Sequence, residues 1–222
     1  MRLKLDLKIF LIIFLFLLTN QIELYSIMMI CAVLHEFGHL LAGLLLKLKP
    51  EKVEVIPIGV RIVFKLNMRD FNKKIGESNV YEIKKIIVAF AGPLTNFILI
   101  YIVSKLDIDI IQKINLVYAN FLLVIVNLLL IFPLDGGRIL YGVIRLFCGK
   151  QKAESVMNIV SILMLFFVTI LGIVAFFYNR NIAIFLFLFY IYFLVLKENK
   201  KYKNRKIIYK ILSKGIEKKY EK

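Results

Sequence analysis

Three residues in the stretch CAVLHEFGHLLAGLL could do chemistry together: His35, Glu36 and His39. In a helix, residues four apart lie on one face, one turn apart, so the two imidazoles can reach a single tetrahedral Zn²⁺. Glu36 lies about 100° around the helix from His35, where it can act on water activated by a metal but is poorly placed as a ligand. HExxH on a helix therefore predicts a zinc site for hydrolysis, with Glu36 as general base and acid.

The residues around the HExxH motif are apolar, and this context favours a metal site over a chance occurrence of the motif. In soluble helices HExxH also occurs by chance as a solvated polar face. Here it interrupts the run IMMICAVL and LLAGLLL, and each ionisable group in the middle of a membrane costs at least about 2.5–3 kcal/mol. These are also the only 2 histidines of the chain. We therefore expect metal binding, with a structural or degenerate site as the alternative.

The composition indicates a membrane protein. Of the 222 residues, 60% are hydrophobic, and they form blocks without helical or alternating spacing. Each block approaches the roughly 20 residues that cross a bilayer as a helix. We predict an all-α polytopic membrane protein with about six transmembrane helices, at residues 8–20, 23–46, 85–104, 114–132, 155–177 and 182–196.

The basic residues predict the orientation of these helices. All but three of the 31 Lys and Arg residues fall in four segments that six spans place on one side of the membrane, namely 1–8, 47–85, 138–152 and 197–222. Basic loops stay in the cytoplasm, so both termini are expected there. The net charge of +16 is thus explained by the basic cytoplasmic segments of a membrane protein, and no nucleic-acid partner is predicted.

The chain between the spans has two distinct segments. KVEVIPIGVRIVFKL is β-branched and roughly alternating, which predicts a small membrane-associated β element near residues 51–66. The tail is either an amphipathic helix on anionic lipid or a solvated segment that fixes topology. The domains are then a first transmembrane helix, a catalytic transmembrane core, two C-terminal transmembrane helices and a basic cytoplasmic tail, at 1–22, 23–150, 151–196 and 197–222.

Two histidines leave a catalytic zinc one protein ligand short of the usual three. Asp135 follows the fourth apolar span, where Pro133 breaks the helix and Gly136 and Gly137 allow a tight turn. We expect this turn to bring Asp135 towards the histidines near the cytoplasmic face. A turn or helix-cap role is the alternative, and other aspartates lie in loops, namely Asp70, Asp107 and Asp109.

Two asparagines within apolar runs are further candidates. Asn96 follows the small residues of AFAGPLTNFIL, and Asn127 precedes the end of the fourth span. Each could bond a neighbouring helix, or hold a substrate carbonyl or backbone. From the residues alone, the structural role is favoured and the functional one stays open.

HEFGH, AGPLTN and NLLLIFPLDGGR, taken in this order and spacing, resemble the site-2 protease family of intramembrane zinc metalloproteases. The resemblance covers about residues 25–145. It implies a zinc site formed by His35, His39 and Asp135, with Glu36 as catalytic acid and base. It also implies that Asn96 lies near the active site. Substrate-holding residues are implied too, namely Asn127 and the turn from Pro133 through Gly136 to Gly137, and the β element would pair with an unwound substrate.

Within that family the chain is most similar to the stage IV sporulation protein FB type. This implies an endopeptidase that cleaves a membrane-tethered sigma-factor precursor, in the bacterial cell membrane or around the forespore. An anti-sigma factor and signal-peptide remnants are alternative substrates. The protein could also bind a membrane-protein inhibitor or form a homo-oligomer. From another class, a zinc transporter or a catalytically dead scaffold is the rival interpretation.

Overall fold

The computed structural model describes residues 2–5, 22–56, 59–64, 75–179 and 183–220. These divide into two compact units, residues 1–129 (unit 1) and residues 130–222 (unit 2). The predicted first span, 8–20, lies outside the described residues. Both units are predominantly helical in the part of the chain that is described.

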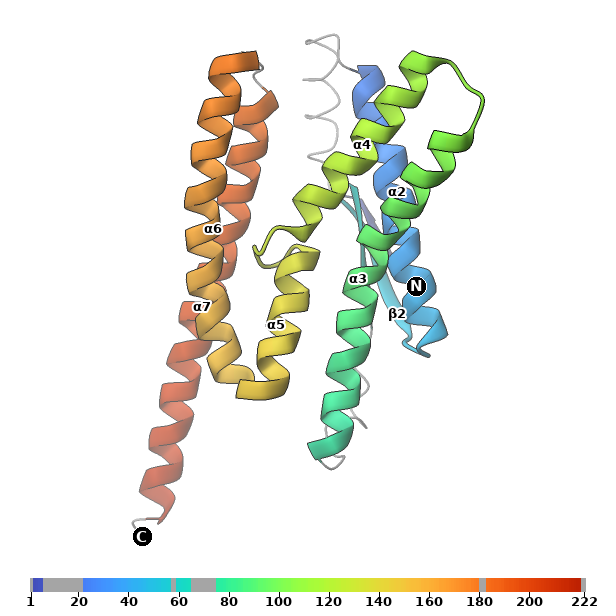
Figure 1. The fold of residues 1–222 in the computed structure, drawn as a ribbon. Coiled ribbons are helices and arrows are strands. Elements are labelled where there is room, and N and C mark those ends of the chain that lie inside the picture. The colour runs from blue at the N-terminus through green and yellow to red at the C-terminus, as the bar shows by residue number, and fades with distance from the viewer. Residues whose placement is uncertain (1, 6–21, 57–58, 65–74, 180–182, 221–222) are drawn as a thin grey trace. The chain divides into compact units, whose positions relative to one another are not determined.

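Unit 1 is built on three helices, each in contact with the other two (Figure 1). They are α2 (Ile22–Leu45), α3 (Ile75–Lys105) and α4 (Ile110–Leu128). The buried cluster between α2 and α4 includes Cys31, Ala32, Ala119 and Leu123. Small residues at such contacts let helix backbones approach closely, which drives packing where lipid replaces water. The helix that carries HExxH is therefore held on two sides.

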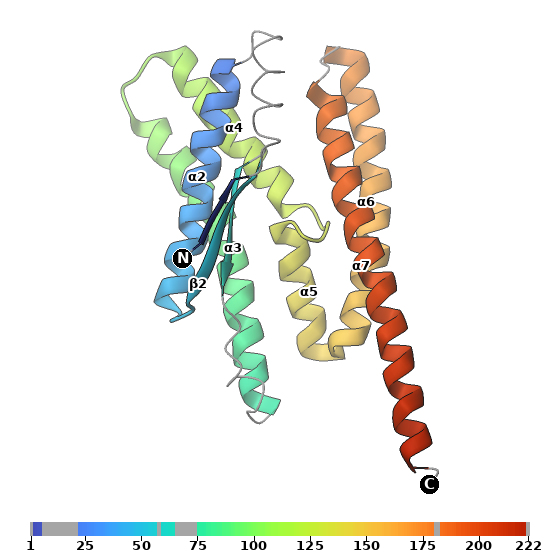
Figure 2. The same ribbon diagram turned by 180° about the vertical axis from the view of Figure 1, so that it is seen from behind.

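A three-stranded sheet lies beside α2 in unit 1 (Figure 2). Strand β2 (Pro50–Ile56) pairs with β1 (Arg2–Leu5) in parallel and with β3 (Gly59–Phe64) in antiparallel fashion. The contact with α2 needs Gly43, because a Cβ there would lie 2.2 Å from the Phe64 ring. Strands β2 and β3 fall in the segment predicted to form a β element, and its membrane association stays a prediction. Strand β1 was not predicted.

Unit 2 contains α5 (Asp135–Cys148), α6 (Lys150–Asn179) and α7 (Ala183–Tyr220), with α6 in contact with the other two. No helix was predicted over residues 138–152, but α5 occupies most of this segment, and its assignment to the cytoplasmic side stays a prediction. Asp135 lies in the first turn, where a negative charge favours a helix, and Gly149 follows the last residue with φ 78°. These end signals mark a short amphipathic helix.

The basic tail continues α7 without a break as far as Tyr220. Its packed face is tied to α6, because Arg205 Nε lies 3.3 Å from Glu154 Oε2 and Lys150 Nζ lies 5.8 Å from the centre of the Tyr209 ring. Between residues 197 and 211, where burial is described, most of the exposed side chains are basic, and Ile207 and Ile211 are exposed among them. Binding of the tail to anionic lipid stays a prediction.

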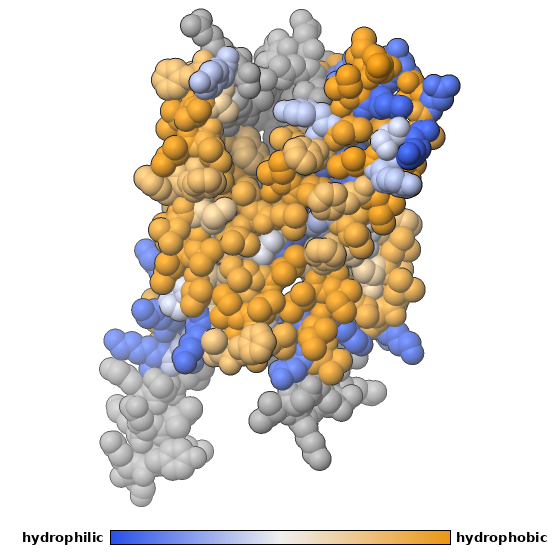
Figure 3. All heavy atoms as spheres, viewed as in Figure 1, coloured by the Kyte–Doolittle hydropathy of each residue, from blue (hydrophilic) through white to orange (hydrophobic). Residues whose placement is uncertain are grey.

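Four of the described helices are long and apolar enough to cross a membrane, over Tyr25–Leu45, Asn79–Lys105, Ile110–Leu128 and Lys150–Tyr178. They coincide with the second to fifth predicted spans. The surface that α3, α4 and α6 present in Figure 3 is mainly hydrophobic, as lipid contact requires. The described part of the sixth predicted span, 183–196, belongs to α7, which is not among these four helices.

Helix α3 begins before the predicted span. The polar segment NMRDFNKKIGESN was predicted to be a loop, but its last residues, 75–79, are helical. The added turns carry Lys84, whose Nζ donates to the carbonyl of Leu46 at 3.0 Å. Because Leu46 follows the last turn of α2, this bond satisfies a carbonyl that the helix leaves free. The polar start of α3 therefore anchors α2.

Candidate metal centre

His35 and His39 lie on one buried face of α2, each 3% exposed. Their Nε2 atoms are 3.1 Å apart, and the ring planes cross at 86°. Two nitrogens bound to one tetrahedral zinc at 2.0–2.1 Å would be about 3.3 Å apart. The two imidazoles are therefore already arranged to bind one metal ion.

A backbone carbonyl of α3 fixes the tautomer of His39. Its Nδ1 lies 2.6 Å from the carbonyl oxygen of Val88. Because a carbonyl can only accept, Nδ1 carries the proton and the lone pair is on Nε2, the atom that faces His35. An outer hydrogen bond of this kind orients metal-binding histidines in proteins. The sequence does not reveal this partner, since it depends on where α3 crosses α2.

Helix α3 presents Gly92 to the two rings. A Cβ built on Gly92 would lie 2.4 Å from His39 Nε2 and 2.5 Å from His35 Nε2. Nearby, a Cβ on Gly38 would lie 2.0 Å from Thr95 Oγ1. Glycine on both helices thus allows α2 and α3 to approach until the imidazoles meet the α3 backbone. The sequence suggested only a close packing or a kink at Ala91–Pro93.

Asn96 is fully buried, at 0% exposed, one turn along α3 from Gly92. Among the described residues neither Nδ2 nor Oδ1 of Asn96 has a hydrogen-bond partner. Asn120 on α4 is as deeply buried, but its Nδ2 donates to Cys31 Sγ at 3.2 Å and to the Leu116 carbonyl at 2.9 Å. A buried amide without a partner is costly, by about 1–3 kcal/mol per group. Asn120 makes hydrogen bonds within unit 1, whereas Asn96 makes none to the described residues.

Glu36 and Asn127, the other predicted site residues of unit 1, are both half-buried. Glu36 is next to His35 on α2, and Asn127 is in the last turn of α4. Of the alternative metal ligands, Asp107 and Asp109 are exposed, and Asp109 caps α4 by accepting from the amides of Ile111 and Gln112. Asp109 therefore has a structural role, and Asp70 lies outside the described residues.

Asp135, Pro133 and Gly136 belong to unit 2. Asp135 is buried, and the N-cap of α5 is Leu134, so the carboxylate belongs to the first helical turn and does not cap it. Arg138 Nη1 lies 3.5 Å from Asp135 Oδ1, a long ion pair. Pro133 is in the turn before α5, after a cis peptide bond, and Gly136 is buried.

The turn before α5 folds tightly against the helix. A Cβ on Gly137 would lie 2.5 Å from the carbonyl carbon and oxygen of Ile131. The amide of Phe132 donates to Ser161 Oγ on α6 at 3.1 Å, which holds the same turn from the other side. The position of the Asp135 carboxylate within unit 2 is therefore fixed by backbone contacts on both sides of the turn.

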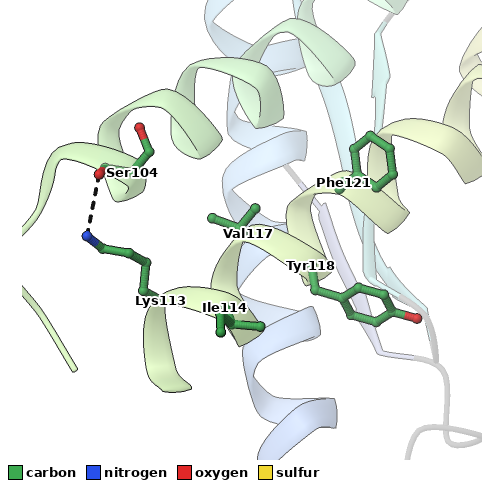
Figure 4. Close-up of a pocket in the computed structure, with 6 residues that line it drawn as sticks. All are labelled: Ser104, Lys113, Ile114, Val117, Tyr118 and Phe121. Carbon is green, nitrogen blue, oxygen red and sulfur yellow. Dashed lines mark hydrogen bonds between the residues drawn. The ribbon is translucent and has the colours of Figure 1, made fainter. Parts of the chain in front are cut away.

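A separate hollow of about 410 Å³ lies between the end of α3 and the start of α4 (Figure 4). Its lining is apolar except at one edge, where Lys113 Nζ donates to the Ser104 carbonyl at 3.4 Å. None of the predicted site residues lines it, and the remaining lining residues are Ile114, Val117, Tyr118 and Phe121. It is part of the apolar outer surface of these helices.

The chain is similar to known proteins in both sequence and fold. The chain is 27% identical over 205 residues to a zinc metalloprotease of Methanocaldococcus jannaschii, which covers 87% of the chain but only 54% of that relative's length. The fold is similar to that of a site-2 protease from the same organism, with a TM-score of 0.64, 24% identity, and coverage of 88% of this chain and 89% of the other. No protein-family model matches the chain.

Proposed function

We propose that the protein is an intramembrane zinc metalloprotease of the site-2 type, which hydrolyses a peptide bond of a membrane-associated protein. The observation that carries this proposal is the pair of buried imidazoles, with Nε2 atoms 3.1 Å apart, inside a helix able to cross a membrane. Burial of such a pair in lipid would be costly without a ligand. The likeness to a zinc metalloprotease and to the site-2 protease fold supports the proposal.

The proposed zinc ligands are His35, His39 and Asp135. Each offers one ligand atom, a ring nitrogen or a carboxylate oxygen, and all three are buried. Two His and one carboxylate form a known catalytic zinc set that leaves a fourth position open. The glycine turn before α5 supports the role of Asp135, because it fixes a buried carboxylate that does not cap its helix. Replacing Asp135 with Asn is expected to weaken zinc binding.

Glu36 is proposed as the catalytic base and acid. A bound zinc ion would supply Lewis acidity, which polarises a peptide carbonyl and brings the pKa of water towards about 7. Glu36 would take a proton from that water and pass it to the leaving nitrogen of the peptide. Its half-buried position suits this role, because it is adjacent to His35, a proposed metal ligand, and is not fully enclosed by the described residues.

Asn96 is proposed to bind the substrate backbone. Its amide offers both a donor and an acceptor, and neither has a partner among the described residues. A peptide unwound from its helix exposes the carbonyl and N–H groups that such an amide can bind. Asn127, Pro133 and Gly136 stay proposed substrate contacts on the motif resemblance alone.

The finer proposal concerns biology. The motif resemblance favours a sigma-factor precursor of sporulation as the substrate, with both termini and the active site towards the cytoplasm. The basic segments, which include the exposed face of the α7 tail, support that orientation. An anti-sigma factor or a signal-peptide remnant would use the same chemistry.

The test is cleavage of membrane-tethered candidate substrates by the purified protein in proteoliposomes, comparing wild type with Glu36→Gln. The variant keeps the shape of the side chain and both histidines, so zinc content and fold are expected to be unchanged. Cleavage is expected to fall by at least about 100-fold, the range of general acid–base catalysis. Equal cleavage by wild type and variant would refute the proposal. Zinc flux across the same proteoliposomes, without cleavage, would instead assign a transporter.

A further inference from the structure

Gly92 is a mid-helix residue with no side chain, and it faces the candidate metal ligands. Glycine inside a helix is less stable than alanine, so a mid-helix glycine that contacts functional groups calls for a reason. We propose that Gly92 keeps open the space in which the metal ion sits between His35 and His39, and that any side chain there excludes the metal. This inference rests on the metal site of the proposed function and assigns it a further positioning residue.

The distances define that space. A carbon on Gly92 would be 2.4 Å from one Nε2 and 2.5 Å from the other. Carbon and nitrogen that are not bonded to each other need well over 3 Å, whereas zinc binds imidazole nitrogen at 2.0–2.1 Å. A methyl group at Gly92 would also lie 2.4 Å from His39 Cε1, so it would overlap the edge of that ring beside Nε2. It could not stay there with both rings in place, and the two nitrogens can face a common metal ion only while residue 92 carries no side chain.

The imidazoles can avoid the added carbon only by turning away. His39 is held by the 2.6 Å bond between its Nδ1 and the Val88 carbonyl, on the same helix as Gly92 and one turn before it. Turning the ring would break this bond and separate the two Nε2 atoms, which are now 3.1 Å apart. If the rings stay, the carbon blocks the metal, and if they turn, the lone pairs no longer converge. Both responses remove the metal position.

Helix α2 is also tied to α3 by the hydrogen bond from Lys84 Nζ to the Leu46 carbonyl, 3.0 Å long, which opposes separation of the two helices. Gly38 on α2 lies against Thr95 and the Ala91 carbonyl of α3, with its Cβ position 2.0 Å and 3.0 Å from these oxygen atoms. The two helices already touch there, so the distance between Gly92 and the rings is set by backbone contact. A larger residue at 92 could be accommodated only at the histidines.

The test measures zinc binding by full-length protein in detergent, for wild type, Gly92→Ala and Gly172→Ala. Gly172 on α6 is a matched control, because a Cβ there meets the flexible side chain of Leu188 at 2.7 Å and none of the proposed metal ligands. Zinc per chain is measured after equilibration with buffered zinc. Wild type and Gly172→Ala are expected to hold about one zinc with equal affinity. Disturbing a partner of a metal ligand weakens binding 10–100-fold, so Gly92→Ala, at the metal position, is expected to weaken it at least about 100-fold.

A second measurement separates this role from helix packing. With zinc removed by a chelator, Gly92→Ala is expected to keep the helix content of zinc-free wild type and to unfold at a somewhat lower midpoint, because its methyl meets imidazole side chains that can turn at the cost of the Val88 bond. Zinc binding by Gly92→Ala within threefold of wild type would overturn the inference. A zinc-free variant that no longer folds would also overturn it, because the glycine would then serve packing.

These outcomes differ from those that test the enzyme. If wild type holds zinc and Gly92→Ala does not, the inference stands even if no substrate is cleaved, and only the proposed proteolysis fails. If Gly92→Ala holds zinc and wild type cleaves substrate, the proteolysis stands and the inference fails.

Discussion

Replacing Asn96 with leucine tests whether this buried amide exists for function or for packing. Asn96 is 0% exposed, and neither of its polar atoms has a partner among the described residues. A buried polar atom without a hydrogen bond costs about 1–3 kcal/mol. Leucine branches at Cγ as asparagine does, so it removes both polar atoms with little change in shape. The substitution should therefore stabilise the protein while it impairs cleavage.

The magnitude follows from two opposing terms. Removing two unsatisfied atoms relieves about 2 kcal/mol at the low end of that range. The methyl groups of leucine are larger than the atoms they replace, and overpacking opposes the gain by on the order of 1 kcal/mol. We expect the free energy of unfolding of Asn96→Leu to exceed that of wild type by about 1 kcal/mol.

Asn120 provides the matched control, since it is 1% exposed and differs from Asn96 in its hydrogen bonds. Asn120→Leu loses one bond between helices, to Cys31 Sγ, and one within α4, to the Leu116 carbonyl, and we assign each about 0.6 kcal/mol, the average of side-chain hydrogen bonds measured in a membrane protein. It also removes one unsatisfied atom, Oδ1, and that gain is offset by the same overpacking. The net expectation is a loss of about 1 kcal/mol, so the two variants should differ by about 2 kcal/mol.

The assay is unfolding by sodium dodecyl sulfate in mixed micelles, followed by far-ultraviolet circular dichroism, with and without a zinc chelator. Cleavage by the same preparations is measured in parallel. If Asn96→Leu is destabilised as much as Asn120→Leu, Asn96 has a packing role and the reasoning is refuted. If it is more stable but cleaves normally, the amide does not bind substrate.

Two further predictions concern packing in each unit. In unit 1, Gly43→Ala is expected to lower the free energy of unfolding by about 1–3 kcal/mol, because its methyl would meet the Phe64 ring. The same change in a Phe64→Ala background should cost almost nothing, and an equal cost in both backgrounds would contradict the contact. In unit 2, a double-mutant cycle of Glu154→Gln and Arg205→Met is expected to give a coupling energy of about 0.5–1 kcal/mol, measured by unfolding. The two charged atoms are 3.3 Å apart but lack hydrogen-bond geometry, and Arg205 is 39% exposed while Glu154 is 6% exposed. The coupling energy should therefore resemble that of a surface ion pair. A coupling energy near zero would show that other contacts hold the tail.

The sequence predicts features that depend on neighbours along the chain. The spacing of His35 and His39 places their rings on one helix face whatever surrounds it, and the structure has both buried there. The apolar blocks locate four membrane-crossing helices for the same reason. Each of these features is specified by residues close together in the chain, by spacing for the histidines and by block length for the spans, which is why the sequence alone sufficed.

Features that depend on a crossing of two helices were not predicted. The bond from His39 to the Val88 carbonyl involves a backbone atom, so no residue type at position 88 signals it. Gly92 could be recognised as a close-packing residue but not as one that faces the imidazoles. Helix α5 was missed for another reason. Helices were located by long apolar blocks, and α5 is short and carries basic residues, so it did not stand out from a loop.

The contact between α2 and α3 has a consequence for access. Gly38 meets Thr95, and Gly92 meets both imidazoles, at distances that leave no room even for a methyl group. A seam packed to this density admits neither a water molecule nor an extended peptide without separating the two backbones. Whatever reaches the histidines must therefore approach from another side, and this seam forms a closed wall of the site.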